Sequence, residues 1–142
     1  MILLDTDHLT VLRYRTSDRA ARLTERLAAV PTADGPIGTT VVNVEEAMRG
    51  WLAAVAKERQ PHRQIPAYRE LAELFTFFSG YHIALFDRAA ADLFASFSAV
   101  RIGTRDRKIA AIASAHSALL LTANRQDFEQ IPGLHFANWL DA

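Results

Sequence analysis

Residues 1–7 read Met-Ile-Leu-Leu-Asp-Thr-Asp, a short apolar run that ends in two acidic residues. Continuous apolar runs are typical of strands in parallel sheets, because helices cover both faces of such a sheet. We therefore predict a buried strand over residues 2–5. A helix that Asp7 can cap follows it, to about Arg15. The chain thus begins with a strand followed by a helix, as α/β proteins do, and carboxylates lie between the two elements.

The same alternation continues along the chain. Further strands are predicted over residues 39–42, 81–86, 119–122 and, at the edge of the sheet, 135–139. Helices are predicted from Ser17 or Asp18 to Pro31, from about Val44, from near Pro66 to Phe78, after Asp87, over 109–116, and briefly around Phe128. Strands separated by helices predict a three-layer α/β/α sandwich with a central parallel sheet of four to five strands.

Two predicted helices carry wide apolar faces. The first face consists of Val44, Met48, Trp51 and Val55. The second consists of Tyr68, Leu71, Leu74, Phe75 and Phe78, with Phe77 off the stripe. Periodicity assigns most of these side chains to the core. A wide apolar surface on helices is also where a partner helix can bind.

Composition limits the classes of protein that the chain can belong to. Its 142 residues are enough for one domain, which we expect over residues 1–142. No apolar run approaches the ~20 residues of a membrane span, and the start lacks signal-peptide features, so we expect a cytoplasmic protein. The chain has no cysteine, which leaves oxygen or imidazole as metal ligands. Sixteen basic residues balance sixteen acidic ones, so nucleic-acid binding would depend on local patches.

Four carboxylates lie where a predicted strand ends or a predicted helix begins: Asp5, Glu46, Asp106 and Asp127. Parallel strands direct their carboxyl ends toward one edge of the sheet, where ligands bind. Carboxylates brought together there repel one another unless protons or cations neutralise them, and Mg²⁺ favours such oxygen ligands. The distribution therefore predicts one metal site.

Each carboxylate also has a simpler explanation. Asp5 or Asp7 can cap the first helix, Asp106 can cap a later one, and Asp127 follows Asn124 at capping-box spacing. Glu46 stands three residues before Arg49, at the spacing of a surface ion pair. On a helical wheel, Glu46 lies opposite the apolar stripe and Glu45 borders it, so periodicity does not choose between them. All four simpler explanations would have to hold together to remove the metal site.

Four segments resemble one known family. They are the opening Leu-Leu-Asp-Thr-Asp, Val-Glu-Glu-Ala-Met-Arg-Gly-Trp over 44–51, Ile-Gly-Thr-Arg-Asp-Arg-Lys-Ile-Ala-Ala-Ile-Ala from Ile102, and Leu-Thr-Ala-Asn-Arg-Gln-Asp-Phe from Leu121. In this order and spacing they resemble PIN-domain ribonucleases, most of all the VapC toxins of toxin–antitoxin pairs. The resemblance spans nearly the whole chain.

The resemblance assigns the family's acids residue by residue. They fall on Asp5, on Glu46 because it stands four residues before Gly50, on Asp106 and on Asp127. The polar residues expected to support them are Thr6, Asp7, Thr122 and Asn124. Asp7 stands where the family often has Asn or Ser, which leaves open whether Asp7 joins the metal shell. Ala123 replaces an arginine that often occupies the final motif.

The implied activity is metal-dependent cleavage of RNA. One or two Mg²⁺ or Mn²⁺ ions would activate a water for in-line attack on a phosphodiester, leaving a 5′-phosphate and a 3′-hydroxyl. Arginines beside Asp106 are candidate contacts to RNA phosphates, namely Arg105 and Arg107 together with Lys108. The implied partners are an RNA substrate, a second copy of the chain, and a small VapB-like antitoxin that covers the helical groove.

Three alternatives stay open. Imidazoles could act as general acid and base without metal. Only His8 is predicted near the acidic edge, whereas His82 and His116 are expected to be core histidines. Asp5-Thr6-Asp7 also matches the start of haloacid-dehalogenase-like phosphatases, in which the first aspartate is a nucleophile, although Leu9 and the missing later acids do not fit. Finally, a non-catalytic PIN domain could bind RNA or protein without cleaving it.

Overall fold

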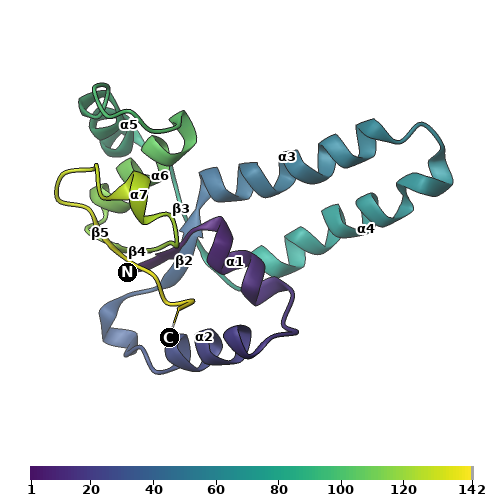
Figure 1. The fold of residues 1–142 in the computed structure, drawn as a ribbon, viewed down its shortest axis with the longest axis horizontal. Coiled ribbons are helices and arrows are strands. Elements are labelled where there is room, and N and C mark those ends of the chain that lie inside the picture. Colours follow the sequence, from purple (N-terminus) through teal and green to yellow (C-terminus); the bar gives the residue numbers. More distant parts are fainter. Residues whose placement is uncertain (142) are drawn as a thin grey trace.

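A five-stranded parallel sheet lies at the centre of the computed structural model, which describes residues 1–141 (Figure 1). The strands are β1 (Ile2–Leu4), β2 (Ile37–Thr40), β3 (His82–Ala84), β4 (Leu119–Leu121) and β5 (His135–Ala137). Their order across the sheet is β3-β2-β1-β4-β5, and every neighbouring pair is parallel. The predicted parallel α/β/α architecture is confirmed.

Helices cover both faces of the sheet. They are α1 (Thr6–Arg13), α2 (Asp18–Ala28), α3 (Val41–Lys57), α4 (Pro61–Phe78), α5 (Arg88–Ser96), α6 (Thr104–Ala115) and α7 (Arg125–Phe128), with a 3₁₀ turn at Thr32–Asp34. Among residues 1–141, no helix combines the length and the apolar character needed to cross a bilayer.

Alternate side chains of the two central strands enter different cores. Leu3 and Leu120 are paired across β1 and β4 and pack with the buried residues of α6 and α7. Leu4 and Leu121 point to the opposite face, where they pack with α1 and α2. Both faces are therefore buried, which is why these strands consist of continuous apolar residues rather than an alternating pattern.

The boundary between β2 and α3 differs from the prediction. Strand β2 occupies residues 37–40 rather than 39–42, and Val41 and Val42 already belong to α3. The reason is Thr40, whose hydroxyl accepts a hydrogen bond from the Asn43 amide and caps α3. Of the two aspartates that could cap α1, Asp5 is the N-cap residue, two residues before Asp7.

Helices α3 and α4 form a long hairpin that projects away from the sheet (Figure 1). Helix α4 starts earlier than predicted: its first residue is Pro61, and Pro66 lies inside the helix rather than near its start. Because most of the hairpin leaves the sheet, Tyr68 and Phe75 are exposed, contrary to their assignment to the core. Phe77, expected off the apolar face, instead packs in the core with Phe78 and Tyr81.

Gly38 allows β2 and β3 to pair closely. A Cβ at this position would lie 2.0 Å from the carbonyl oxygen of His82 on the neighbouring strand. Gly38→Ala is therefore expected to lower the free energy of unfolding by at least about 2 kcal/mol, since backbone would have to move. Urea denaturation measures this change.

Gly50→Ala is the matched control for Gly38→Ala. Gly50 is an exposed residue within α3, and apart from its chain neighbours and the helix's own backbone nothing lies within 4 Å of an added Cβ. Alanine there should raise stability by about 0.5–1 kcal/mol, because it favours the helix. If the two substitutions had equal effects, the close contact between β2 and β3 would not be the reason why residue 38 is glycine.

Candidate active site

Asp5 lies at the carboxyl end of β1 and is held by three neighbours. Its Oδ1 accepts hydrogen bonds from the Thr6 amide at 2.8 Å and from Asn43 Nδ2 at 2.9 Å, and its Oδ2 accepts one from the Thr122 hydroxyl at 2.8 Å. Only 8% of Asp5 is exposed. Burial raises its pKa, and the hydrogen bonds from Thr122 and Thr6 partly oppose that rise. Asp5 therefore both caps α1 and belongs to the acidic cluster.

Asn43 is a buried site residue that the sequence analysis did not identify. Its side chain accepts a hydrogen bond from the Thr40 hydroxyl at 2.7 Å and donates to Asp5 at 2.9 Å and to the Thr6 hydroxyl at 3.2 Å. It therefore joins the carboxyl ends of β1 and β2. The available signal was a lone amide among valines, three residues after a capping threonine.

Asp106 and Asp127 approach each other from the starts of α6 and α7. Asn124 Nδ2 lies 3.1 Å from the Asp127 carboxylate and 3.5 Å from the Asp106 carboxylate. The pKa of Asp106 is raised to about 6 by burial first, and then by the negative charges of Asp5, Asp127 and Glu46. Gly103, not Asp106, is the N-cap residue of α6, so the capping explanation of Asp106 is wrong.

Glu46, rather than Glu45, faces the other acids. Burial raises the pKa of Glu46, and the charge of Asp5 adds to this rise while Arg105 opposes it. Glu45 instead forms an exposed ion pair with Arg49 at 3.1 Å. The structure therefore distinguishes two neighbouring glutamates between which the helical period did not choose: Glu46 faces the acids, and Glu45 pairs with Arg49.

Asp7 is fixed by the buried His8. Trp139 donates its backbone N–H to His8 Nε2 at 3.1 Å, so the proton of the neutral ring is on Nδ1, which lies 2.5 Å from Asp7 Oδ1. Asp7 Oδ2 accepts from the Ala123 amide at 2.8 Å. Burial alone would raise the pKa of Asp7, but these hydrogen bonds outweigh it and leave the pKa lowered. With both ring nitrogens engaged inside the core, His8 is not free to act as a general acid or base.

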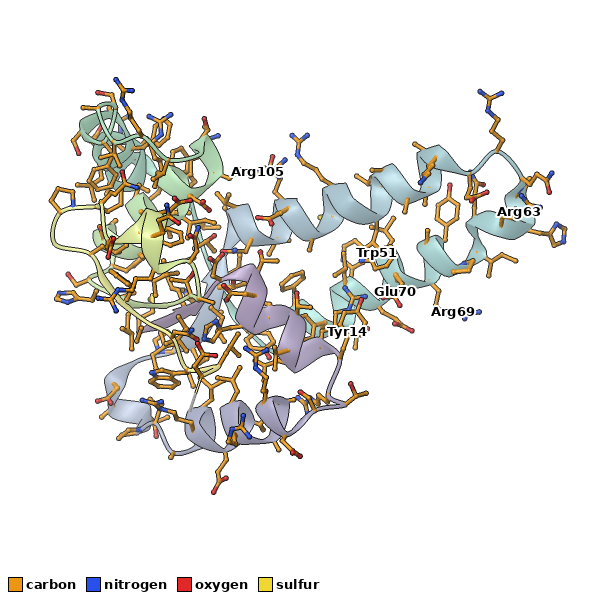
Figure 2. The ribbon with its side chains drawn as sticks, viewed as in Figure 1. Tyr14, Trp51, Arg63, Arg69, Glu70 and Arg105 are labelled. Carbon is orange, nitrogen blue, oxygen red and sulfur yellow. The ribbon has the colours of Figure 1, made fainter. Side chains whose placement is uncertain are left out.

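The basic residues beside Asp106 do not all face the acids. Arg105 is exposed near the start of α3 (Figure 2). Arg107 instead lies over the ring of Phe94 at 5.1 Å, and Lys108 lies over the ring of Phe86 at 5.7 Å. Of the three candidate RNA contacts, Arg105 alone is exposed, because the other two lie over the rings of Phe94 in α5 and of Phe86 in the segment before α5.

Two histidines expected in the core are exposed. His82 lies on the edge strand β3, and His116 follows the last residue of α6. Neither has the apolar surroundings that the period of its segment suggested, because β3 has a neighbour on one side only and α6 ends at Ala115.

The four acids lie toward one edge of the sheet but do not form a complete metal-binding site. Across residues 1–141, no three carboxylate or imidazole side chains are grouped closely enough to hold a metal ion as they stand. The chemistry of the donors nevertheless fits a hard divalent cation, because all four are carboxylates and three, Asp5, Glu46 and Asp106, have pKa values raised by burial and by neighbouring negative charges. A cation that drew them together would relieve this repulsion.

The raised pKa of Asp106 predicts a dependence of stability on pH. Between pH 3.8 and about 6 the folded chain retains a proton that the unfolded chain releases, so stability falls as pH rises through this window. In EDTA, Asp106→Asn should therefore raise the free energy of unfolding at pH 7.5, with a smaller gain at pH 4. Asp92→Asn, at an exposed carboxylate of α5, is the control. Destabilisation by Asp106→Asn at pH 7.5 would contradict the proposed repulsion.

The fold and the acids at this edge define a class of protein: parallel α/β/α sandwiches that carry carboxylates at the ends of their strands. The PIN-domain family matches residues 2–134, and the chain belongs to that family. The phosphatase alternative is thereby set aside. Comparison with curated proteins gives no match.

Solved structures with the same fold come from toxin–antitoxin complexes. A chain of VapBC2 from Rickettsia felis, bound to a promoter DNA fragment, is 24% identical with a TM-score of 0.73, and the match covers 98% of this chain and 99% of that one. A chain of VapBC-1 from nontypeable Haemophilus influenzae is 16% identical with a TM-score of 0.75, covering 98% of both. A chain of FitAcB from Neisseria gonorrhoeae is 22% identical with a TM-score of 0.69, covering 100% of both. At these identities the likeness is one of fold.

Proposed function

We propose that this chain is a metal-dependent endoribonuclease, the toxin of a toxin–antitoxin pair acting in the cytoplasm. The observation that carries the proposal is the approach of Asp5, Glu46 and Asp127 to Asp106: burial first, and then the charges of these three acids, raise the pKa of Asp106 to about 6. Membership of the PIN family and the likeness to VapBC chains support the same function.

Asp5 and Asp106 are the proposed direct ligands of Mg²⁺ or Mn²⁺, with Glu46 and Asp127 completing the shell or holding its waters. A carboxylate offers about four acceptor positions. Asp5 uses both positions of Oδ1 for Thr6 and Asn43 and one position of Oδ2 for Thr122, which leaves one at Oδ2 for a cation. One or two bound ions would supply Lewis acidity toward the phosphodiester and the attacking water.

The surrounding polar residues have positioning roles in this proposal. Thr122 and Asn43 hold Asp5, and Asn124 holds Asp127 near Asp106. Asp7 is occupied by His8 and by the Ala123 amide, so we assign it to fixing the loop after β4 rather than to the metal shell. Arg105 is the proposed contact to an RNA phosphate beside the acids.

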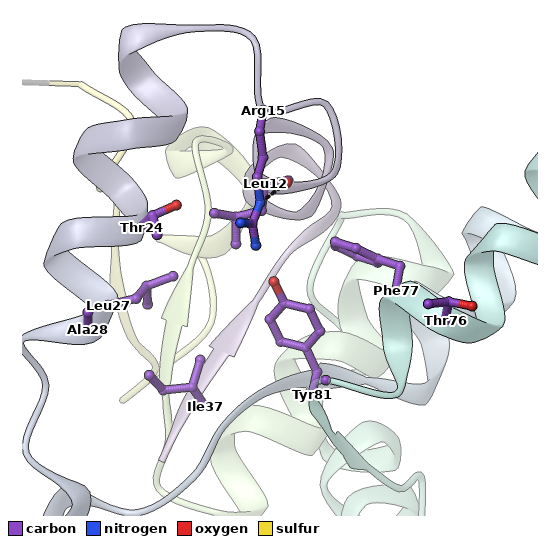
Figure 3. Close-up of a pocket in the computed structure, with 10 residues that line it drawn as sticks. Leu12, Arg15, Thr24, Leu27, Ala28, Ile37, Thr76, Phe77 and Tyr81 are labelled. Carbon is purple, nitrogen blue, oxygen red and sulfur yellow. Dashed lines mark hydrogen bonds between the residues drawn. The ribbon is translucent and has the colours of Figure 1, made fainter.

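Two adjoining grooves fit a partner that blocks the site. One, of about 490 Å³, lies between α1, α2 and the end of α4, with Leu12, Leu27 and Tyr81 among its lining residues (Figure 3). The second, of about 210 Å³, lies between α1, α3 and α4, and Phe77 borders both. Thr6 and Asn43, which touch Asp5, line the second groove. A chain that followed both grooves would therefore end beside the acids.

We propose that the small antitoxin occupies these grooves. Its apolar side chains would cover Tyr14 and Trp51 in the second groove. We also propose that the toxin forms a homodimer. Phe75, which is 68% exposed on the opposite side of the α3–α4 hairpin beside Met48, gives a free chain apolar surface through which to associate. A free chain that stays monomeric at high concentration in light scattering would count against this association.

Cleavage of RNA by the purified chain tests the nuclease activity. With transfer, ribosomal and messenger RNA as substrates, we expect cleavage in Mg²⁺, none in excess EDTA, and recovery on adding Mn²⁺. The products should carry 5′-phosphates. Cleavage that continues in EDTA, or the absence of cleavage of all three RNA classes, would contradict the proposal.

A further inference from the structure

The tip of the α3–α4 hairpin carries a concentration of positive charge. Residues 57–63 include Lys57, Arg59 and Arg63 against a single acid, Glu58, in a chain whose formal net charge is zero. None of the ion pairs among residues 1–141 involves these three basic side chains. Arg63 lies at the far end of the hairpin from the sheet (Figure 2). The tip thus presents three exposed cationic side chains that outnumber its single acid and form none of these ion pairs.

The turn that carries these charges is fixed in shape. The Gln64 side chain donates hydrogen bonds to the carbonyl oxygens of Val55 at 3.1 Å and Glu58 at 2.8 Å. These bonds join the start of α4 to the end of α3, where the last carbonyl groups of a helix lack partners within the helix. A surface held in this way loses less conformational entropy when it binds a ligand.

One face of α3 connects the acids to the tip. Lys57 stands eleven residues after Glu46, which is about three turns and ~17 Å along the helix, so both residues project from the same face. Between them that face carries the exposed small residues Gly50 and Ala53. Arg49 borders this face and pairs with Glu45, which leaves Gly50 and Ala53 along the middle of the face between Glu46 and Lys57.

We propose that the hairpin tip is a second contact for the RNA backbone, so that the enzyme selects RNA extending at least about five nucleotides beyond the cleaved bond. A stacked strand rises about 3.4 Å per nucleotide, and five nucleotides span the ~17 Å from Glu46 to Lys57. Lysine and arginine bind phosphates independently of base sequence. This inference rests on the proposed nuclease function, because it places the cleaved bond at the acids.

Fluorescence anisotropy in EDTA separates binding from cleavage. The probes are fluorescein-labelled single-stranded RNAs of 4 and 20 nucleotides, and the variant is Lys57→Gln/Arg59→Gln/Arg63→Gln. At 0.1 M salt it should bind the 20-nucleotide RNA about tenfold or more weakly than the parent. The slope of log affinity against log salt should fall by about 2 in magnitude, since three phosphate contacts are lost. Affinity for the 4-nucleotide RNA should not change.

The matched control is Arg19→Gln/Arg22→Gln/Arg88→Gln, which removes the same charge at exposed positions on α2 and α5. It should bind the longer RNA as the parent does. Equal losses of RNA affinity in the two triple variants, or no loss in the tip variant, would overturn the inference. The tip would then be a surface for an acidic protein partner instead. If the parent binds RNA through the tip but cleaves none in Mg²⁺, the nuclease proposal fails, and with it the selection of RNA by its length beyond the cleaved bond, while the tip remains an RNA contact.

Discussion

Asp5→Asn and Asp106→Asn should each reduce RNA cleavage in Mg²⁺ by at least about 100-fold, because each removes a proposed direct ligand of the ion. Both substitutions preserve side-chain shape. Asparagine also remains a favourable N-cap residue, so α1 should keep its start when Asp5 is replaced. Single-turnover cleavage of an end-labelled RNA measures the effect, and circular dichroism checks that the variants are folded.

Glu45→Gln is the control for these two variants. It removes a carboxylate from the same turn of α3 as Glu46, but one that is exposed and paired with Arg49. Cleavage by this variant should stay within about twofold of the parent, since exposed ion pairs contribute little. Parental rates in folded Asp5→Asn and Asp106→Asn proteins would remove the acids from the mechanism.

Phe128→Ala should lower the free energy of unfolding by about 3–5 kcal/mol, which is a large fraction of the stability of a typical domain. Phe128 is fully buried in the core between the sheet and α6, and it is the one residue of α7 in that core. It follows Asp127 directly, so its loss should also release the segment that carries this acid. Urea denaturation measures the stability, and Phe128→Leu should cost much less because most of the volume remains.

Phe75→Ala is the control for Phe128→Ala in the same measurement of unfolding free energy. Its side chain is 68% exposed, so truncation should change the stability of the monomer by about 0.5 kcal/mol or less. Equal losses at Phe75 and Phe128 would mean that these two phenylalanines do not differ in burial as described.

Local patterns in the sequence were sufficient to predict the sheet. The apolar runs at Ile2–Leu4 and Leu119–Leu121 are buried on both faces, and continuous hydrophobicity signals such strands directly. Ser17 and Asp87 begin their helices as predicted, because each side chain accepts a hydrogen bond from an amide three residues on. These features depend on neighbours in the chain, which the sequence displays.

The features that were mispredicted depend on distant contacts. Tyr68 and Phe75 have the period of a core face, yet they are exposed because α4 leaves the sheet as part of a hairpin. Arg107 and Lys108 have the spacing of an RNA-binding patch, yet they lie over aromatic rings of Phe94 and Phe86. Period and spacing do not show which surface meets a neighbour.

The acidic edge was only partly predictable. Strand ends and the family motifs indicated Asp5, Glu46, Asp106 and Asp127, and their functional roles remain predictions. The supporting network was less visible. Asn43 joins two strands through hydrogen bonds to Thr40 and Asp5, and His8 holds Asp7 only because Trp139, far along the chain, occupies its other nitrogen. Such contacts follow from the folded topology rather than from local pattern.

A crystal structure of the protein soaked in Mn²⁺ tests the central claim most directly. We expect an anomalous peak between the carboxylates of Asp5 and Asp106, with Glu46 and Asp127 turned toward it. An acidic edge that stays free of anomalous density at saturating Mn²⁺ would contradict the claim that these carboxylates form a divalent-cation site.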